Sequence, residues 1–312
     1  MKRLRTFVSL FLVCAASPTL AQWSNAGGNE GRNGRSAEIG PEAAETIWDT
    51  APSSVIAWQP VIEGRRVYAV RQTGFPPEPS SNESPIICFD LDTGAELFRI
   101  EIPFVDGDWT TWIAGVKDGK LYTARSGNGT TSVGPLWCYD ATDGSFLWTS
   151  TDTTTAGFYD GVVFAPSGDP VVADFRNITR FDADTGATVW RTPRTCSVTG
   201  SCGPAIGNGA VYTVDAVPGG HAVCRYNLTT GAFEYDSSVM TGFTLQNTPM
   251  VAPDGTIYVP RSQNNASTDF FYAFDDTGTD IVERWSVPTQ WTTSSELAVG
   301  PDDSVYHVAP GR

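Results

Sequence analysis

The sequence predicts an all-β fold, a β-propeller of four-stranded antiparallel blades, and two observations carry this prediction. First, a short pattern occurs five times, in which an aromatic residue precedes an acidic or amide residue, a few polar residues and a glycine. Second, the glycines of successive copies are separated by 50, 42, 45 and 47 residues. Repeats of this length are typical of propeller blades, whereas most solenoid units are shorter.

Each copy of the pattern has the composition of a tight turn that connects the two outer strands of a blade. The acidic or amide side chain can cap the turn, and the glycine can take a positive φ angle without steric cost. The turn residues are Asp90 with Gly94, Asp140 with Gly144, Asp182 with Gly186, Asn227 with Gly231, and Asp275 with Gly278. A short run after each glycine ends in a large aromatic residue, which we expect to wedge between neighbouring blades. These aromatics are Phe98, Trp148, Trp190, Tyr235 and Trp285.

A second set of hairpins lies between the copies. Glycine-centred turns, two of them Asp-Gly and one Asn-Gly, are flanked by apolar residues in the ranges 61–68, 115–122, 205–212 and 251–258. An Asn-Gly or Asp-Gly pair in such a setting is the strongest short-range signal for a β-hairpin. We therefore expect these ranges to form inner strands of the blades.

The ends of the chain bear on the number of blades. At about 45 residues per blade, the residues after a leader of 21 give six to six and a half blades, and 296–307 reads as the inner hairpin of a sixth. No further copy of the turn pattern follows it before Arg312. Residues 46–49 match an outermost strand that would staple the first blade to the last. Either the sixth blade is incomplete, or the chain is a fragment of a seven- or eight-bladed ring, since propellers avoid open edges.

The combined unit resembles a known family. An inner hairpin with Asp-Gly followed by an apolar residue and Tyr, and then Phe/Tyr-Asp-x-x-Thr-Gly-x-x-x-Trp, is similar to the PQQ-like β-propeller repeat of bacterial quinoproteins and of the outer-membrane barrel-assembly scaffold. The resemblance covers about residues 46–309. The segment from Trp23 to Gly34 resembles the lead-in of such propellers. We therefore divide the chain into a signal peptide at 1–21, a lead-in at 22–44 and a PQQ-like propeller at 45–312.

The first 21 residues predict a secreted or periplasmic location. A basic start at Lys2, Arg3 and Arg5 precedes an apolar stretch, and small residues lead to a cleavage site after Ala21, as in a secretory signal peptide. The leader carries three basic residues and no acidic ones, so its removal changes the net charge from −15 to −18. Such an acidic surface repels phosphate backbones. We expect no nucleic-acid partner, no membrane span and a monomer.

The cysteines predict little chemistry. Cys196 and Cys202 either close a small disulfide loop in an oxidising compartment or remain thiols. Cys88 and Cys138 each stand two residues before a turn aspartate. Equivalent positions of adjacent blades are too far apart for a disulfide, so we expect both to be small core residues.

The sequence lacks the cofactor-binding motifs of the quinoprotein dehydrogenases that it resembles. The resemblance to quinoprotein dehydrogenases implies adjacent cysteines over the quinone and a Glu/Asn/Asp calcium site, but no Cys-Cys pair occurs and no local motif matches those ligands. Two histidines, His221 and His307, are expected in turns or on strand surfaces. Calcium is a competing interpretation of the aspartate-rich turns, but their spacing fits neither an EF-hand nor an Asp box. We therefore assign no catalytic, cofactor-binding or metal residue and expect no cofactor.

One set of aromatic residues suggests a binding surface. Large rings stand just before the inner hairpins, at entries that converge near one mouth of the channel: Trp58, Trp109, Trp112, Phe243 and Trp291. They suit a protein or peptide partner, or a carbohydrate, although packing between blades is the simpler role for any one of them. Two functions follow as hypotheses: a non-catalytic binding or assembly scaffold, or a quinone-dependent oxidoreductase or its degenerate remnant.

Overall fold

The computed structural model describes twelve stretches of the chain, and all regular structure in them is β-strand. They are residues 22–36, 42–43, 45–50, 59–71, 84–102, 108–127, 133–155, 162–196, 203–240, 248–261, 269–289 and 297–307. None of the described residues forms a helix, and hence none forms a helix suited to crossing a membrane. The predicted signal peptide lies outside the described residues.

The strands form six sheets that follow one another along the chain, which we number as blades 1 to 6. Blade 1 holds β1 (Gln22–Trp23), β2 (Val61–Glu63), β3 (Arg66–Val70), β4 (Ile86–Asp90) and β5 (Glu96–Ile100). Blade 2 holds β6 (Asp108–Lys117), β7 (Lys120–Gly127), β8 (Val133–Asp140) and β9 (Phe146–Thr155). Blade 3 holds β10 (Val163–Phe164), β11 (Pro170–Ala173), β12 (Asn177–Phe181) and β13 (Thr188–Pro193).

The second half of the ring repeats the same plan. Blade 4 holds β14 (Ala205–Gly207), β15 (Ala210–Val217), β16 (Gly220–Asn227) and β17 (Phe233–Asp236). Blade 5 holds β18 (Met250–Val251), β19 (Ile257–Arg261), β20 (Asp269–Asp276) and β21 (Ile281–Thr289). Blade 6 consists of the hairpin β22 (Leu297–Val299) and β23 (Val305–His307).

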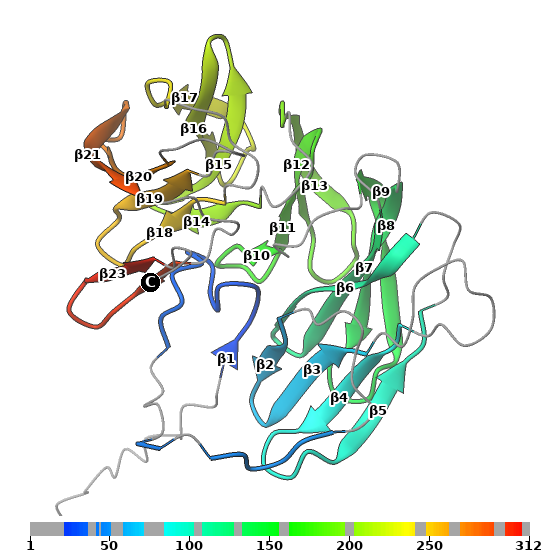
Figure 1. The fold of residues 1–312 in the computed structure, drawn as a ribbon. Coiled ribbons are helices and arrows are strands. Elements are labelled where there is room, and N and C mark those ends of the chain that lie inside the picture. Colours follow the sequence, from blue (N-terminus) through cyan, green and yellow to red (C-terminus); the bar gives the residue numbers. More distant parts are fainter. Residues whose placement is uncertain are drawn as a thin grey trace, which may run out of the picture.

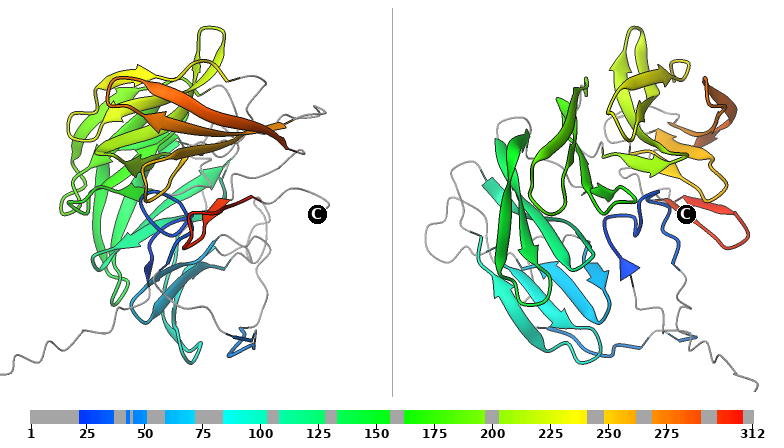
Figure 2. Two further views of the ribbon diagram at one scale, coloured as in Figure 1. Left: turned by 90° about the vertical axis from the view of Figure 1, so that its left-hand side faces the viewer. Right: turned by 180° about the vertical axis from the view of Figure 1, so that it is seen from behind.

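The blades stand side by side around a common centre in the order of the sequence, as a propeller requires. Figures 1 and 2 show the sheets passing from blade 1 around to the β22–β23 hairpin, with the N-terminal segment inside the ring. All pairs of strands within the blades are antiparallel. The predicted fold class is therefore confirmed, with five full blades and two strands of a sixth among the described residues.

Four of the predicted turns are capped as the sequence indicated. In blade 1 the carboxylate of Asp90 accepts hydrogen bonds from the backbone of Asp92 at 3.1 Å and of Thr93 at 2.9 Å, and Gly94 has a φ of 66°. The amide oxygen of Asn227 accepts from the backbone of Thr229 and Thr230, both at 3.0 Å. Asp140 with Gly144 and Asp182 with Gly186 form equivalent turns.

The fifth turn differs from the prediction. This copy is one residue shorter, and Asp276 rather than Asp275 accepts the backbone hydrogen bond, from Gly278 at 2.8 Å. Asp275 instead pairs with Arg284 of β21. Asp276 also accepts from Tyr212 and, at 2.7 Å, from Tyr235 of blade 4. Burial alone would raise the pKa of Asp276, but these hydrogen bonds outweigh it and hold the pKa below its usual value.

Three of the turn glycines, those of blades 2, 3 and 4, are covered by an aromatic ring of the preceding blade, whereas a Cβ atom placed on Gly278 of blade 5 would meet no atom within 4 Å. A Cβ atom placed on Gly186 would lie 2.5 Å from the ring of Trp148, and one on Gly231 would lie 2.5 Å from that of Trp190. Phe98 approaches Gly144 in the same way at 2.7 Å. The predicted wedging between blades is therefore confirmed for these three rings, and only glycine leaves room for it. Trp285, by contrast, is 36% exposed.

Residues 45–50 supply a further aromatic ring that covers a turn glycine, in this case that of blade 1. They form no strand, in contrast to the expectation for 46–49, since no described strand pairs with them. Trp48 nevertheless covers Gly94 of blade 1, where a Cβ atom on the glycine would lie 2.6 Å from the ring, and its indole donates to the carbonyl of Leu91 at 2.9 Å. Trp48 thus occupies the place of an outer-strand aromatic from a blade that precedes blade 1.

The hydrophobic core lies between blades. One cluster joins Trp112, Tyr122 and Trp148 of blade 2 to Phe164 and Phe181 of blade 3. Further clusters join blades 1 and 2, 3 and 4, 4 and 5, and 5 and 6. Cys88 and Cys138 are fully buried in two of these clusters, as expected from the sequence.

Candidate functional site

The described part of the lead-in, residues 22–36, crosses the centre of the ring and binds the inner strands. β1 pairs with β2 of blade 1, with Trp23 opposite Ile62. Carbonyl groups of this segment then accept hydrogen bonds from the inner strands of four more blades. The donors are Val116, Ile206, Val251 and Val299, and the acceptors are Ser24, Glu30, Gly31 and Asn33, each pair 2.8 Å apart. The lead-in therefore satisfies inner-strand N–H groups that face the channel.

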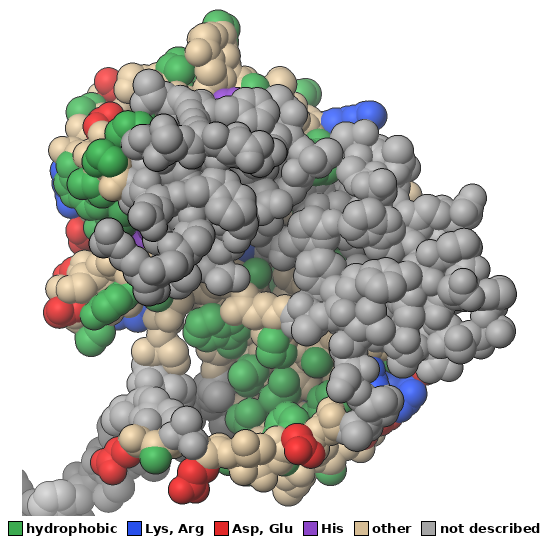
Figure 3. All heavy atoms as spheres, in the orientation of Figure 1, with side chains coloured by type: hydrophobic (Ala, Val, Ile, Leu, Met, Phe, Trp, Pro, Cys, Tyr) green, Lys and Arg blue, Asp and Glu red, His purple; other side chains and the backbone are tan. Residues whose placement is uncertain are grey.

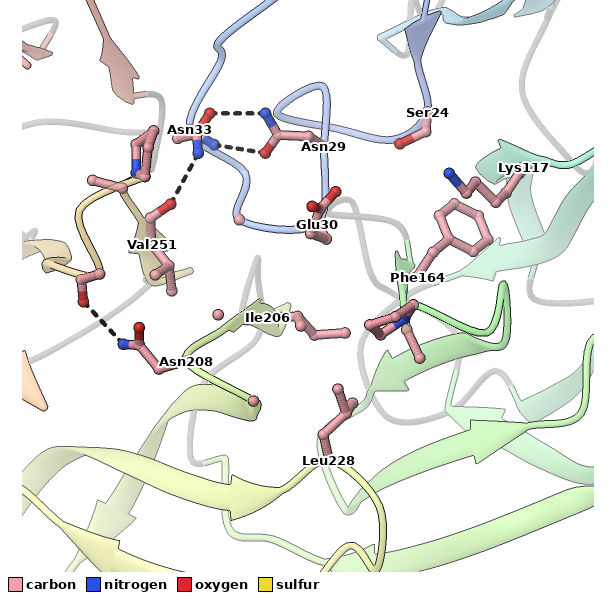
Figure 4. Close-up of a pocket in the computed structure, with 18 residues that line it drawn as sticks. Ser24, Asn29, Glu30, Asn33, Lys117, Phe164, Ile206, Asn208, Leu228 and Val251 are labelled. Atoms are coloured by element: carbon pink, nitrogen blue, oxygen red, sulfur yellow. Dashed lines mark hydrogen bonds between the residues drawn. The ribbon is translucent and has the colours of Figure 1, made fainter. Parts of the chain in front are cut away.

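Two buried side chains fix the lead-in at its midpoint. Arg32 is 6% exposed, and its Nε donates to the carbonyl of Pro204 at 2.6 Å while its Nη1 donates to that of Ala26 at 2.9 Å. Asn33 is 7% exposed and donates from Nδ2 to the carbonyl of Val251 at 3.0 Å. Figure 4 shows this amide between the lead-in and blade 5. The lead-in is thus held by side chains as well as by its backbone.

A cavity of about 520 Å³ lies between the lead-in and the inner turns of blades 2 to 5. This volume falls in the range of ordinary ligand pockets. Figure 4 shows Ser24, Glu30 and Lys117 at one side of it and Asn208 and Val251 at another. The other lining residues belong to the lead-in and to turns of blades 3 to 5. They are Asn29, Gly31, Asn33, Phe164, Ala165, Pro166, Ile206, Gly207, Gly209, Leu228, Ala252, Pro253 and Gly255.

The lining is suited to binding polar groups. Its only hydroxyl, that of Ser24, donates to the carbonyl of Gly28 at 3.4 Å. Its only ionisable side chains are Glu30 and Lys117, and neither histidine nor cysteine lines it. Lys117 also lies near Glu63, whose pKa is raised by burial and lowered in part by that ammonium group. The cavity therefore presents backbone groups, amides and one charge of each sign.

The structure describes little of the predicted aromatic binding face. Trp58, Phe243 and Trp291 lie outside the described residues, as does the side chain of Trp109, whose backbone belongs to β6. Trp112 is 3% exposed and belongs to the core cluster between blades 2 and 3. The one ring of the set that is described therefore packs between blades, the simpler role considered above.

Other candidate residues have structural surroundings. Cys202 lies outside the described residues, so the predicted pair with Cys196 stays a prediction; the backbone of Cys196 donates to Phe175 at 3.3 Å. His221 is 7% exposed within β16, which corrects the expectation of a surface or turn position, because its strand is covered on both faces. His307 lies in β23 and stacks on Phe271, with ring centres 5.4 Å apart.

Sequence reasoning missed two features of this centre. The inner hairpin of blade 3, β10 with β11, turns at Gly168 with a φ of 90°, and only a Ser-Gly pair signals it in the sequence. The second is the role of the lead-in, whose many Asn and Gly residues indicate a loop but not its hydrogen bonds to distant strands. These bonds join residues more than 80 positions apart and have no local signal.

The described residues do not supply the ligands that the quinoprotein resemblance implies. No three side chains of His, Cys, Asp or Glu gather within reach of a metal ion in the described part of the chain. The turn carboxylates, the other candidates for calcium, are engaged in capping hydrogen bonds. We therefore derive no step through a quinone or a calcium ion.

Repeats of this kind, arranged around a channel with aromatic rings packed on turn glycines, define a PQQ-like β-propeller. A family model described as outer membrane protein assembly factor BamB (PQQ_2) matches residues 82–310. The chain belongs to this family. No curated protein matches it.

Solved structures agree on the fold. The quinohemoprotein alcohol dehydrogenase ADHIIG of Pseudomonas putida HK5 superposes with a TM-score of 0.51 at 12% identity, over 74% of this chain and 52% of the enzyme. The chain thus spans about half the length of that protein. A europium-containing methanol dehydrogenase gives 0.51 at 13% identity over 86% and 78% of the two chains. BamB from Moraxella catarrhalis gives a lower score, 0.44, at 15% identity over 78% and 76%.

Proposed function

We propose that the protein is a non-catalytic binding or assembly scaffold that works in the periplasm or outside the cell. The family model that matches the chain is described as an outer membrane protein assembly factor. The basic, apolar and small residues of positions 1–21 support export. The partner class that fits best is a protein or peptide, with carbohydrate as the alternative, and the acidic surface disfavours nucleic acid. The scaffold acts as a monomer in this proposal.

The composition of the channel cavity is the single observation that carries this choice. Backbone groups and amides line it, together with Glu30 and Lys117, and its one hydroxyl is already engaged. Such a lining can pair with the N–H and C=O groups of an extended polypeptide and with one terminal charge. It offers no nucleophile with a base beside it, which acyl or phosphoryl transfer would need. The likeness to dehydrogenases concerns the fold, so a redox enzyme remains the second hypothesis.

A binding titration tests the proposal. The probe is a urea-unfolded outer-membrane β-barrel polypeptide, diluted into the purified mature protein, with complex formation followed by fluorescence anisotropy. We expect saturable binding that weakens about tenfold in Lys117→Ala, whereas Lys120→Ala changes it little. Lys120 is the matched control because it lies in the neighbouring strand β7 and pairs with Asp184 at 3.1 Å, outside the cavity. Absence of saturable binding, or equal effects of the two substitutions, would contradict the proposal.

A further inference from the structure

The inner strands of the blades present backbone N–H groups to the lead-in at one equivalent position. In blade 5, Ala252 donates across its own hairpin to Thr256 at 2.9 Å. Because hydrogen bonding alternates along a strand, the N–H of the preceding residue, Val251, points the other way, and it donates to Gly31 of the lead-in at 2.8 Å. Blades 2, 4 and 6 donate to the lead-in in the same way, and blade 1 pairs with β1.

Blade 3 is the exception among the described blades. Its hairpin is built like that of blade 5, because Ala165 also precedes a proline and donates across the hairpin to Asp169 at 2.9 Å. The N–H of the preceding residue, Phe164, therefore points away from β11 and toward the channel. Phe164 is 5% exposed and lines the cavity, yet its N–H has no acceptor among the described residues. A buried N–H without an acceptor is rare in proteins.

The lead-in does not supply this acceptor, because its loop at residues 25–29 bonds to the lead-in itself. Four carbonyl groups of this loop accept from backbone N–H groups of the lead-in, each within 3.1 Å. The fifth, that of Ala26, accepts from the side chain of Arg32 at 2.9 Å. The lead-in thus bonds to blade 2 through Ser24 and next to blade 4 through Glu30, and no backbone hydrogen bond of the loop reaches blade 3.

A second donor, the ammonium group of Lys117, lines the same side of the cavity. Figure 4 shows Lys117 beside Phe164. Lys117 forms no ion pair with the described residues. The nearby carboxylate of Glu63 accepts instead from the N–H of Gly119 at 2.9 Å. An ammonium group together with a backbone N–H is a donor set that suits a carboxylate.

The cavity wall next to Phe164 is apolar. Pro166, Ile206 and Leu228 belong to it, and Figure 4 shows Ile206 and Leu228 below Phe164. Such a wall suits an apolar side group of a ligand. The carboxylate of Glu30, which also lines the cavity, can accept from an N–H or ammonium group of the same ligand.

The net charge of the protein does not decide whether an anion binds here. The charge of −15 disfavours an anion at long range. Figure 3 shows the acidic side chains of one face in several separate places. Salt screens exposed charges that are more than about 8–10 Å apart. Binding therefore depends on the donors in the cavity, Lys117 and the N–H of Phe164.

We propose that the cavity binds the carboxylate of a ligand that also carries an apolar side group. The carboxylate accepts hydrogen bonds from the N–H of Phe164 and from the ammonium group of Lys117, and so takes the role that lead-in carbonyl groups have in other blades. The C-terminus of a polypeptide and a free amino acid both supply this chemistry. The inference rests on the proposed binding function of the cavity and names the group that the cavity recognises.

N-acetyl-leucine is the first probe, because it has one carboxylate, one apolar side chain and no ammonium group, like the last residue of a polypeptide. It is titrated into the mature protein with isotope-labelled phenylalanine, and NMR follows the amide signal of Phe164, assigned by its loss in Phe164→Leu. We expect one-to-one binding and a downfield shift of this amide proton as it gains an acceptor. N-acetyl-leucinamide, which lacks the carboxylate, binds at least about tenfold more weakly.

A matched pair of lysine variants tests the second donor. Lys117→Met removes the ammonium group and keeps the length of the side chain. We expect about tenfold weaker binding of N-acetyl-leucine and no change for N-acetyl-leucinamide. Lys120→Met leaves the binding of both probes unchanged, because Lys120 pairs with Asp184 outside the cavity. Circular dichroism confirms that the variants are folded.

Free leucine separates the two sources of the carboxylate. If the cavity takes a free amino acid, leucine binds more tightly than N-acetyl-leucine, and Glu30→Gln removes this difference, since Glu30 is the acidic side chain of the lining. If the cavity takes a polypeptide C-terminus, N-acetyl-leucine binds at least as tightly as leucine. Either result supports a carboxylate site.

Three results would overturn the inference: equal binding of N-acetyl-leucine and its amide, no binding of any probe, or an amide signal of Phe164 that stays in place. The titration with the unfolded barrel polypeptide is judged separately. Saturable binding of that polypeptide without any effect of a carboxylate leaves the scaffold proposal standing and removes this inference. Binding of the carboxylate without binding of the polypeptide does the reverse.

Discussion

The turn carboxylates show how single hydrogen bonds organise each blade. The hydroxyl of Thr185 donates to Asp182 at 2.7 Å, and that of Thr93 donates to Asp90 at 2.8 Å. These hydroxyl hydrogen bonds are the main reason that the pKa of each aspartate lies below its usual value. The same carboxylates that suggest calcium in the sequence therefore act as turn caps.

Replacing the hydroxyl donor should raise the pKa of its aspartate. In Thr185→Val the pKa of Asp182 rises, because the charged form loses a hydrogen bond, and NMR titration of the carboxyl carbon measures it. The pKa of Asp143, lowered by Ser145 in another blade, is the internal control and stays unchanged. A folded pKa below the unfolded value of about 3.9 stabilises the fold above that pH. The stability difference between wild type and variant is therefore lost as the pH falls below about 4. A constant difference down to pH 2 would contradict this assignment.

Substitutions of two glycines in blade 4 test whether the contact between an aromatic side chain and a turn glycine stabilises the fold. Gly231 and Gly209 have nearly the same φ, 73° and 70°, but only Gly231 lies under a ring, that of Trp190. Gly209→Ala costs about 1–2 kcal/mol for the left-handed backbone alone. Gly231→Ala costs roughly 1–3 kcal/mol more, since Trp190 must move. Urea unfolding of both variants measures this, and equal losses would show that the ring contact contributes nothing.

Among the elements, the lead-in bonds to five blades with only a few residues. A few residues accept hydrogen bonds from inner strands of four blades and pair with a fifth. This arrangement ties blade 1 to blade 6 even though the described blades leave the ring open. The lead-in therefore contributes to closure in a way that the blade repeats do not.

Two arginines of the lead-in test whether its buried hydrogen bonds, rather than its surface charge, stabilise the fold. Arg32→Ala should lower the free energy of unfolding by about 2–3 kcal/mol, because buried carbonyl groups of Pro204 and Ala26 lose a charged donor. The side chain of Arg35 forms an exposed ion pair with Asp303 at 3.6 Å, so Arg35→Ala changes stability by less than about 1 kcal/mol. Chemical denaturation of the two variants checks this. Similar values for both would argue against a central role of the lead-in.

The sequence predicts the elements that repeat. The period and the turn residues indicate the blades, and the aromatic after each glycine indicates the contact between blades, because both follow from local geometry. The repeat pattern puts the cap of blade 5 one residue too early, at Asp275, since the shorter copy shifts the turn to Asp276. The cavity and the path of the lead-in could not be predicted, because they depend on contacts between segments far apart in the sequence, such as Glu30 and Ile206, that only the folded chain brings together.

At the scale of the whole molecule, the propeller combines rigid blades with a centre that offers binding groups. Five clusters between blades bury the large side chains. The channel presents backbone and amide groups around the cavity.

The central claim is that the protein binds polypeptide and is not a quinone enzyme. Native mass spectrometry of the mature protein, mixed with pyrroloquinoline quinone and calcium in one sample and with an unfolded outer-membrane β-barrel polypeptide in another, tests it most directly. The account predicts a one-to-one complex with the polypeptide and no stoichiometric quinone complex. A calcium-dependent quinone complex, with no polypeptide bound, would contradict it and assign the protein to redox chemistry.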